Sequence, residues 1–238
     1  MRTETSEGVQ TDSVRTAIGR RDAARIALVV AAALLSTYHL LFRPRHRRWG
    51  ATDEEVRRRL PGDGVTPEPC DETTRAVTIE ASPDEVWAWV VQLGQGRGGF
   101  YSYTWLENMV GAGIHNADRV DPALQQLRAG DRIRMVRPDY WLQSPTTSMV
   151  VERVDPRRTL VLRGHDGGTW TFHLERVDDE TTRFLVRGRK PVARTALGYL
   201  ARYVGYELPH FVMERGMMLG IKARAERAGR AASVSDGG

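Results

Sequence analysis

The residues with the clearest potential for chemistry follow a tryptophan, Trp105, in the middle of the chain. Glu107 and Asn108 come directly after it. A carboxylate that points into an apolar cavity has a raised pKa and can act as a general acid or base, so Glu107 is a candidate catalytic residue. The other interpretation is that Glu107 pairs with a surface arginine, Arg97 or Arg119.

A second polar group, formed by His115, Asn116 and Asp118, lies a few residues further on. Its spacing matches no zinc-binding pattern, and the six histidines are scattered along the chain. His115 is therefore expected to be a hydrogen-bonding loop residue, with a role as general base as the alternative. The residues imply neither a metal ion nor another cofactor.

Three other classes of site find no support. Gly96, Gly98 and Gly99 follow a helix, whereas a phosphate-binding loop precedes the helix whose N-terminus holds the anion. The chain has no G-x-S-x-G motif for a serine nucleophile. Arginines alternate with single core residues in the strands, as on any solvated sheet face, so no nucleic-acid partner is expected.

The elements that must position these residues begin with a strand and a helix. Apolar and polar residues alternate from Arg75 to Ala81, as in a strand with one buried face. Ser82 and Glu85 form a capping box, with Pro83 at the first helical position. Trp89 lies on the apolar stripe of this helix, and glycines end it.

Further strands are predicted at residues 132–137, 149–154, 159–163, 169–175 and 183–187, with short turns between them. Such short connections indicate an antiparallel meander. The chain then turns helical from about Val192 to Tyr206, and Pro209 is expected to begin a separate last helix. The apolar face of that helix includes Met218 and two other methionines, which adapt to irregular surfaces or ligands.

This order of elements, with the motif SPDEVWAWVVQLGQGRGGFYSYTWLEN, resembles the START-like helix-grip superfamily (SRPBCC), which includes polyketide cyclases/dehydratases and lipid-transfer domains. GRGGFYSYTWLEN followed by IHNADR resembles a bacterial branch of it with an N-terminal membrane segment. The likeness covers roughly Thr73 to Arg227. It implies an α+β fold in which a curved antiparallel sheet wraps around a long C-terminal helix, with an apolar cavity between them. It does not imply one activity, because the fold hosts carriers, cyclases and hydrolases.

The resemblance implies that the cavity binds a lipid or another hydrophobic small molecule. Aromatic and methionine side chains are expected to line it, with polar residues at one end. The expected ligand-binding residues are Trp89, Phe100, Tyr101, Trp105, Glu107, Asn108, His115, Phe211 and Met218. The alternatives are a polyketide cyclase/dehydratase-like enzyme that uses Glu107 or His115 as general base, and a structural module with a filled core.

The N-terminal region contains an uncharged apolar run at residues 26–42, with arginines on both sides. At about 1.5 Å per residue it extends roughly 25 Å, close to the thickness of a hydrocarbon core. A single-pass transmembrane helix is therefore predicted at residues 23–43. A cleaved signal peptide is the first alternative, although no small-x-small site follows, and a buried soluble helix is the second.

The expected organisation is a disordered N-terminus (1–22), the transmembrane helix (23–43), a basic juxtamembrane connector (44–72), the START-like domain (73–228) and a disordered tail (229–238). The net charge of +5 comes mostly from arginine. The arginine cluster after the apolar run contains no acid, so we expect the globular domain on the cytoplasmic face of the cell membrane. A single cysteine excludes an intramolecular disulfide, and the oligomeric state stays open.

Overall fold

The computed structural model describes residues 20–109, 111–140 and 147–236, and the chain divides into two compact units, Met1–Pro44 and Arg45–Gly238. Most of the N-terminus predicted to be disordered lies outside the described residues. In the first unit, α1 (Arg20–Thr37) leads through the π-helical η1 (Tyr38–Phe42) into the start of α2 (Arg43–Arg47), whose last residues belong to the second unit. Asp22–Arg47 is the one described helix that is long and apolar enough to cross a membrane, with a mean hydropathy of 1.7.

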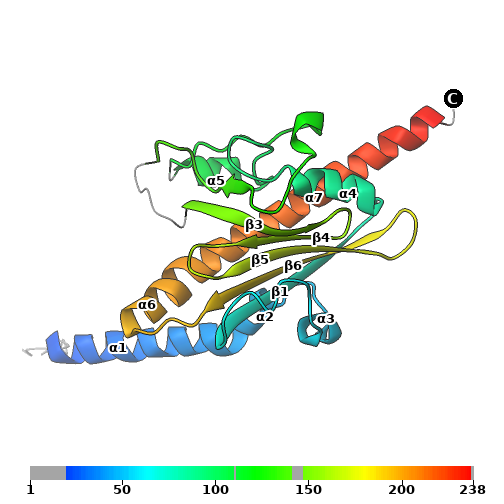
Figure 1. Ribbon diagram of the computed structural model, residues 1–238. Coiled ribbons are helices and arrows are strands. Elements are labelled where there is room, and N and C mark those ends of the chain that lie inside the picture. Colours follow the sequence, from blue (N-terminus) through cyan, green and yellow to red (C-terminus); the bar gives the residue numbers. More distant parts are fainter. Residues whose placement is uncertain (1–19, 110, 141–146, 237–238) are drawn as a thin grey trace, which may run out of the picture. The chain divides into compact units, whose positions relative to one another are not determined.

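The second unit is built on a six-stranded sheet in which all neighbouring strands are antiparallel, in the order β1-β6-β5-β4-β3-β2 (Figure 1). The strands are β1 (Cys70–Ile79), β2 (Arg132–Arg134), β3 (Ser148–Asp155), β4 (Thr159–Arg163), β5 (Thr169–Arg176) and β6 (Thr182–Pro191). Strands adjacent in sequence from β2 to β6 pair with each other, which confirms the predicted meander. The first strand then pairs with the last.

One face of the sheet, which we call the inner face, packs against two helices, α4 (Pro83–Val91) and α7 (Glu207–Asp236). The predicted capping box of α4 is present, because Ser82 and Glu85 each accept a hydrogen bond from the other's backbone N–H. The core between these layers includes Trp89, Phe172 and Met218. The long helix crosses the sheet obliquely (Figure 1). The α+β helix-grip fold predicted from the sequence is confirmed.

The C-terminal helical region is continuous where the sequence predicted a break at Pro209. α6 (Ala196–Leu200) passes into the π-helical η4 (Ala201–Tyr206) and then directly into α7. The prediction of a separate helix beginning at Pro209 is wrong, because the wide turns of η4 accommodate a ring that would clash in a regular α-helix. α7 runs to Asp236, so the described part of the predicted disordered tail is helical. Its alanines favour this conformation.

The opposite, outer face of the sheet is covered by residues 53–69, a large part of the predicted connector. The end of α2 lies along the edge strand: Arg75 Nε donates to the His46 carbonyl at 2.8 Å, and the Ala76 N–H donates to the Trp49 carbonyl at 3.0 Å. α3 (Asp53–Arg57) follows, with the predicted capping box between Thr52 and Glu55. The connector is thus a folded layer of the second unit.

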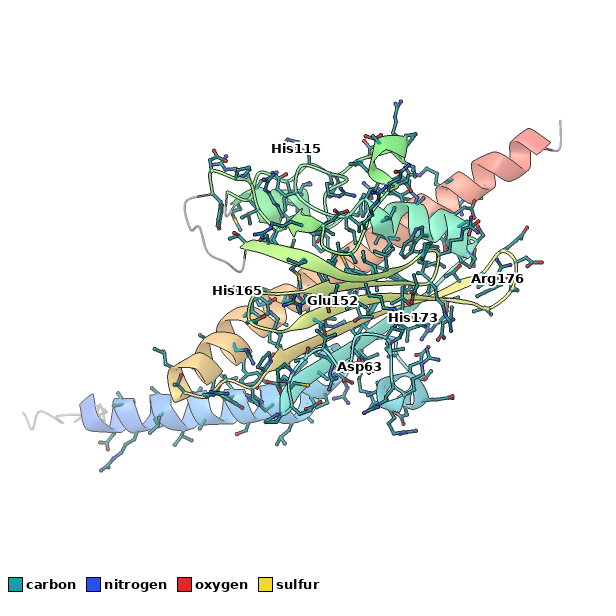
Figure 2. All side chains as sticks on the ribbon, in the orientation of Figure 1. Asp63, His115, Glu152, His165, His173 and Arg176 are labelled. Atoms are coloured by element: carbon teal, nitrogen blue, oxygen red, sulfur yellow. The ribbon has the colours of Figure 1, made fainter. Side chains whose placement is uncertain are left out.

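A buried arginine on β6, Arg187, holds this layer in place. Its Nε donates to Thr74, and Nη1 donates to Asp63 at 2.8 Å and to the Arg58 carbonyl at 2.9 Å. Nη2 donates to the carbonyls of Glu55 and Val56 at 2.7 and 3.2 Å. Every nitrogen of the guanidinium therefore has a partner. In Figure 2, Asp63 lies on the connector beside the sheet.

Two short helices complete the unit. α5 (Thr104–Met109) and the 3-10 helix η2 (Pro122–Leu124) lie in the long connection between α4 and β2. The predicted strand at residues 132–137 is shorter in the structure, because β2 ends at Arg134. Pro138 follows closely, and proline disfavours a continued strand.

Candidate ligand-binding site

A polar cluster lies on the inner face, between the sheet and α7. Arg75 is on β1, Trp170 is on β5, and His210 and Glu214 are one turn apart on α7. The alternation of β1 puts Arg75 on the same face as the buried Ile79. Glu214 belongs to the helix face that continues with core methionines. Strand and helix periodicity therefore bring these four residues, the inner-face cluster, into one layer.

An ion pair forms the centre of the cluster. Arg75 Nη1 lies 3.0 Å from Glu214 Oε1, and both side chains are only 1% exposed. The guanidinium also lies over the ring of Phe211, with 5.1 Å from Cζ to the ring centroid. His210 Nδ1 is 3.5 Å from the other carboxylate oxygen of Glu214. Charged groups buried to this degree are rare unless paired, and here one pair is enclosed in an otherwise apolar core.

Several polar atoms of the cluster lack a hydrogen-bond partner among the described residues. These atoms are Nη1 of Arg75, both carboxylate oxygens of Glu214 and the indole Nε1 of Trp170. The Arg75–Glu214 contact is a close ion pair that does not have hydrogen-bond geometry. A buried donor or acceptor without a partner costs about 1–3 kcal/mol, and a charged one more. The cluster can therefore take further hydrogen bonds.

Aromatic rings surround the indole of Trp170. The ring centroids of Phe172, His210 and Phe100 lie 4.7, 6.1 and 6.4 Å from it. Burial, and then the positive charges of Lys190 and Arg75, lower the pKa of His210 well below its usual range, so the imidazole is neutral at physiological pH. The site thus combines one charged pair, a neutral imidazole and an indole donor in apolar surroundings.

The fold does not place all of the residues predicted to bind ligand next to one another. Trp89, Phe100, Tyr101 and Met218 are buried in the core, where the Trp89 and Tyr101 rings meet edge to face at 5.6 Å. Phe211 is half-buried beside the inner-face cluster. Their role in ligand binding stays a prediction.

The other predicted residues lie elsewhere. Trp105 is 68% exposed, and Asn108 and His115 are exposed as well. Figure 2 shows His115 among the loops on the far side of the sheet from Asp63. The side chain of Glu107 lies outside the described part of the structure.

Asparagines of the motif shape its loop. Asn108 exchanges two hydrogen bonds with the backbone of Ile114, at 2.8 and 3.1 Å. Asn116 Oδ1 accepts from the backbone N–H groups of Phe100 and Tyr101, and its Nδ2 donates to the Ser102 carbonyl. These bonds hold Tyr101 at a φ of 57°, a left-handed conformation rare outside glycine.

The loop shaped in this way packs closely on α7. A Cβ placed at Gly220 would lie 2.0 Å from the carbonyl oxygen of Tyr101. Only glycine permits this approach of helix and loop. The motif that carries the sequence resemblance therefore supports the position of α7.

Sequence reasoning missed all four residues of the inner-face cluster. Two signals were available in the pattern. Arg75 continues the alternation of Val77 and Ile79, and Glu214 interrupts the apolar stripe of the last helix. A charged residue on an apolar face is the informative exception, because such residues are almost never buried unless paired. Trp170 and His210 carried no comparable signal.

Two surface pockets lie away from this cluster. The larger, of ≈480 Å³, is on the outer face between the connector and β6 and includes Asp63, Glu72, Arg187 and Arg189. Two of its arginines form ion pairs, since Arg187 lies 2.8 Å from Asp63, and Arg189 lies 3.2 Å from Glu72 and also contacts Glu68. The smaller, of ≈380 Å³, lies beside the start of α4. The described residues contain no group of three or more histidine, cysteine or acidic side chains placed to hold a metal ion.

No family model matches the chain, and no curated protein matches it. Solved structures with a similar fold include the Zhui aromatase/cyclase from Streptomyces sp. R1128, at 17% identity and a TM-score of 0.40, covering 68% of this chain and 98% of that one. The polyketide cyclase-like protein Cgl2372 from Corynebacterium glutamicum is 15% identical with a TM-score of 0.33, covering 71% and 95%. The Aha1 dimer from Colwellia psychrerythraea is 13% identical with a TM-score of 0.39, covering 66% and 96%.

At these identities the likenesses concern the fold alone. The strand order of the sheet and the long helix across its inner face define an α+β domain with the helix-grip architecture that the sequence resemblance implied.

Proposed function

We propose that this chain is a membrane-anchored helix-grip protein that binds a lipid or another hydrophobic small molecule between its sheet and α7. The inner-face cluster holds the polar end of the ligand. The observation that carries this proposal is the set of buried polar atoms on Glu214 and Trp170 that have no hydrogen-bond partner among the described residues.

The chemistry of these atoms limits the ligand. The Glu214 carboxylate accepts hydrogen bonds, whereas the Trp170 indole only donates one. A polar end that both donates and accepts, as a hydroxyl, an amide or a protonated carboxyl does, suits the two of them. The rest of the ligand would lie against rings such as Phe100 and Phe211, so its body is expected to be apolar.

The membrane anchor is supported by the helix Asp22–Arg47. A single-pass anchor would keep the domain beside a large store of hydrophobic molecules. The arginines that follow the apolar run favour a domain on the cytoplasmic face. A topology reporter fused to the C-terminus tests this orientation, and a signal from the opposite side would reverse it.

Ligand binding is tested by native mass spectrometry of the full chain released from detergent micelles. We expect the wild type to carry a hydrophobic adduct that is lost in Glu214→Gln and Trp170→Phe. The matched control is Trp105→Phe, which changes an exposed tryptophan and should keep the adduct. Thermal unfolding shows whether each variant is folded. A wild type without an adduct, or a folded Trp170→Phe that retains it fully, contradicts the proposal.

The alternative of a cyclase/dehydratase-like enzyme stays a prediction. It needs Glu107 or His115 as general base, and the exposed position of His115 does not favour it. Loss of a turnover in Glu107→Gln with retained ligand binding would support the enzyme.

A further inference from the structure

The helical arm that joins β6 to α7 carries aliphatic side chains on its surface. Leu197, Leu200 and Leu208 are 77%, 51% and 46% exposed, and Val212 is 38% exposed. Two of these residues lie on α6 and two at the start of α7, at helical spacing, so they follow one stripe, which we call the arm face. A single exposed leucine needs no explanation, whereas a stripe of them marks an interaction surface.

The arm face belongs to the end of the second unit at which the chain arrives from the apolar helix. Arg47, the last residue of the candidate span, donates to the Glu72 carbonyl at 2.6 Å and lies 3.7 Å from the Asp71 carboxylate. Tyr203 of η4 donates to the same carboxylate, and Arg202 lies 3.6 Å from it. Within the second unit, Asp71 therefore joins Arg47 to the arm.

Basic and aromatic side chains accompany the arm face. Arg194 precedes α6 and is exposed, and Arg202 lies within η4. Lys190 Nζ donates to the Tyr206 hydroxyl at 2.7 Å, so a lysine and a tyrosine meet beside the stripe. Aliphatic residues flanked by cations and tyrosine are the composition of helices that lie in the interface of a bilayer with anionic lipids.

We propose that the arm face lies in the headgroup region of the bilayer in which the N-terminal helix is anchored. The inference rests on the proposed anchor and deepens it, because a second contact fixes how the domain lies on the membrane. His210 and Glu214 follow Leu208 within two turns of α7. The inner-face cluster thus lies beside lipid, and the bilayer itself is the source of its ligand.

The test uses the full chain in vesicles of phosphatidylcholine and phosphatidylglycerol, with Cys70→Ser and one new cysteine carrying an NBD fluorophore. Three positions are compared. Leu35→Cys reports the anchor, and Leu200→Cys reports the arm face. Val177→Cys is the matched control, because Val177 is an exposed apolar residue in the turn between β5 and β6. Phospholipid with a doxyl group high on its acyl chain quenches a fluorophore at the interface, and phospholipid with a doxyl group deep on the chain quenches one near the bilayer centre, where position 35 is expected.

We expect quenching of about twofold or more at positions 35 and 200, and little at 177, since interfacial helices bury their apolar face about 5–10 Å deep. Quenching at 35 with none at 200 overturns the arm-face proposal and leaves the anchor standing. No quenching at either position overturns both. Equal quenching at 177 and 200 also contradicts the proposal, because the arm would then have no preference for lipid. The mass-spectrometry experiment tests ligand binding separately, so its result does not depend on the quenching results.

Discussion

Two arginines of one sheet, Arg75 and Arg187, are each 1% exposed, yet they meet opposite surroundings. On the outer face, Arg187 has a partner for every guanidinium nitrogen, and four of its five acceptors belong to the connector. On the inner face, Arg75 has one carbonyl and one carboxylate, and both oxygens of that carboxylate keep unused hydrogen-bonding capacity.

The difference distinguishes a buried charge that only holds the fold together from a buried charge that can still bind a polar group. A fully bonded guanidinium fixes two layers and has nothing left for a ligand. An ion pair with unused capacity pays a desolvation cost that a bound polar group would reduce. The outer arginine therefore explains why the connector is folded, and the inner pair is the site to which we assign the proposed ligand.

The largest effect is expected from Arg187→Met. It leaves Asp63 and several carbonyls without their donor, and breaking such a buried network costs about 3–5 kcal/mol in the free energy of unfolding. Chemical denaturation of the full chain in micelles measures it. The control is Arg176→Met, whose ion pair with Asp179 is exposed and worth less than about 1 kcal/mol. Equal effects of the two variants would refute the role assigned to Arg187.

The inner pair should behave as a replaceable unit. Glu214→Leu alone leaves the Arg75 charge buried and is expected to cost about 3 kcal/mol or more. Adding Arg75→Met should recover most of this stability, because a buried ion pair can often be exchanged for apolar residues at little cost. The double variant should still lose the ligand adduct. Recovered stability together with retained adduct would show that the cluster is not the binding site.

Gly220→Ala tests the close approach that positions the inner face. The added Cβ would meet the Tyr101 carbonyl at 2.0 Å, and overpacking of this kind costs about 1–3 kcal/mol. Gly205→Ala is the control, since a Cβ at Gly205 in η4 meets nothing within 4 Å. We expect its unfolding midpoint to be unchanged or slightly raised. If Gly220→Ala left the unfolding midpoint unchanged, the close contact between the loop and α7 would not contribute to stability.

The smallest effect is the dependence on pH. Burial lowers the pKa of His173 on the outer face and, with nearby positive charges, that of His210 on the inner face. The unfolded chain protonates these two histidines more readily than the folded chain does. The stability that their neutral forms contribute is therefore fully present above the unfolded pKa of about 6.5 and is lost as the pH falls below it.

Unfolding midpoints at pH 7.5 and 5.5 measure this loss. His173→Gln and His210→Gln should each make the drop in midpoint between the two pH values smaller. A bound ligand should reduce the part of the drop that comes from His210 and leave the part from His173 unchanged. If both variants keep the acid sensitivity of the wild type, other groups cause it.

Local signals made much of the fold predictable. Alternation located the strands, and the capping boxes at Ser82 and Thr52 located the starts of two helices, because both features depend on neighbours in sequence. The site depends on long-range pairing. Arg75 and Glu214 are far apart in the sequence, and only the packing of α7 on β1 joins them. The loop motif drew the sequence-based interpretation toward Asn108 and His115, whose role in binding stays a prediction. In the structure the hydrogen bonds of Asn108 and Asn116 shape the loop itself.

The Trp49 backbone and the end of α2 run along the outermost strand, β1, and this has a practical consequence for anyone preparing a soluble fragment. A fragment begun at residue 73 would strip that edge bare and leave Arg187 without most of its acceptors. Bare edges pair with one another, so such a fragment is expected to aggregate. A fragment begun at Arg45 keeps the edge capped and is the one to express.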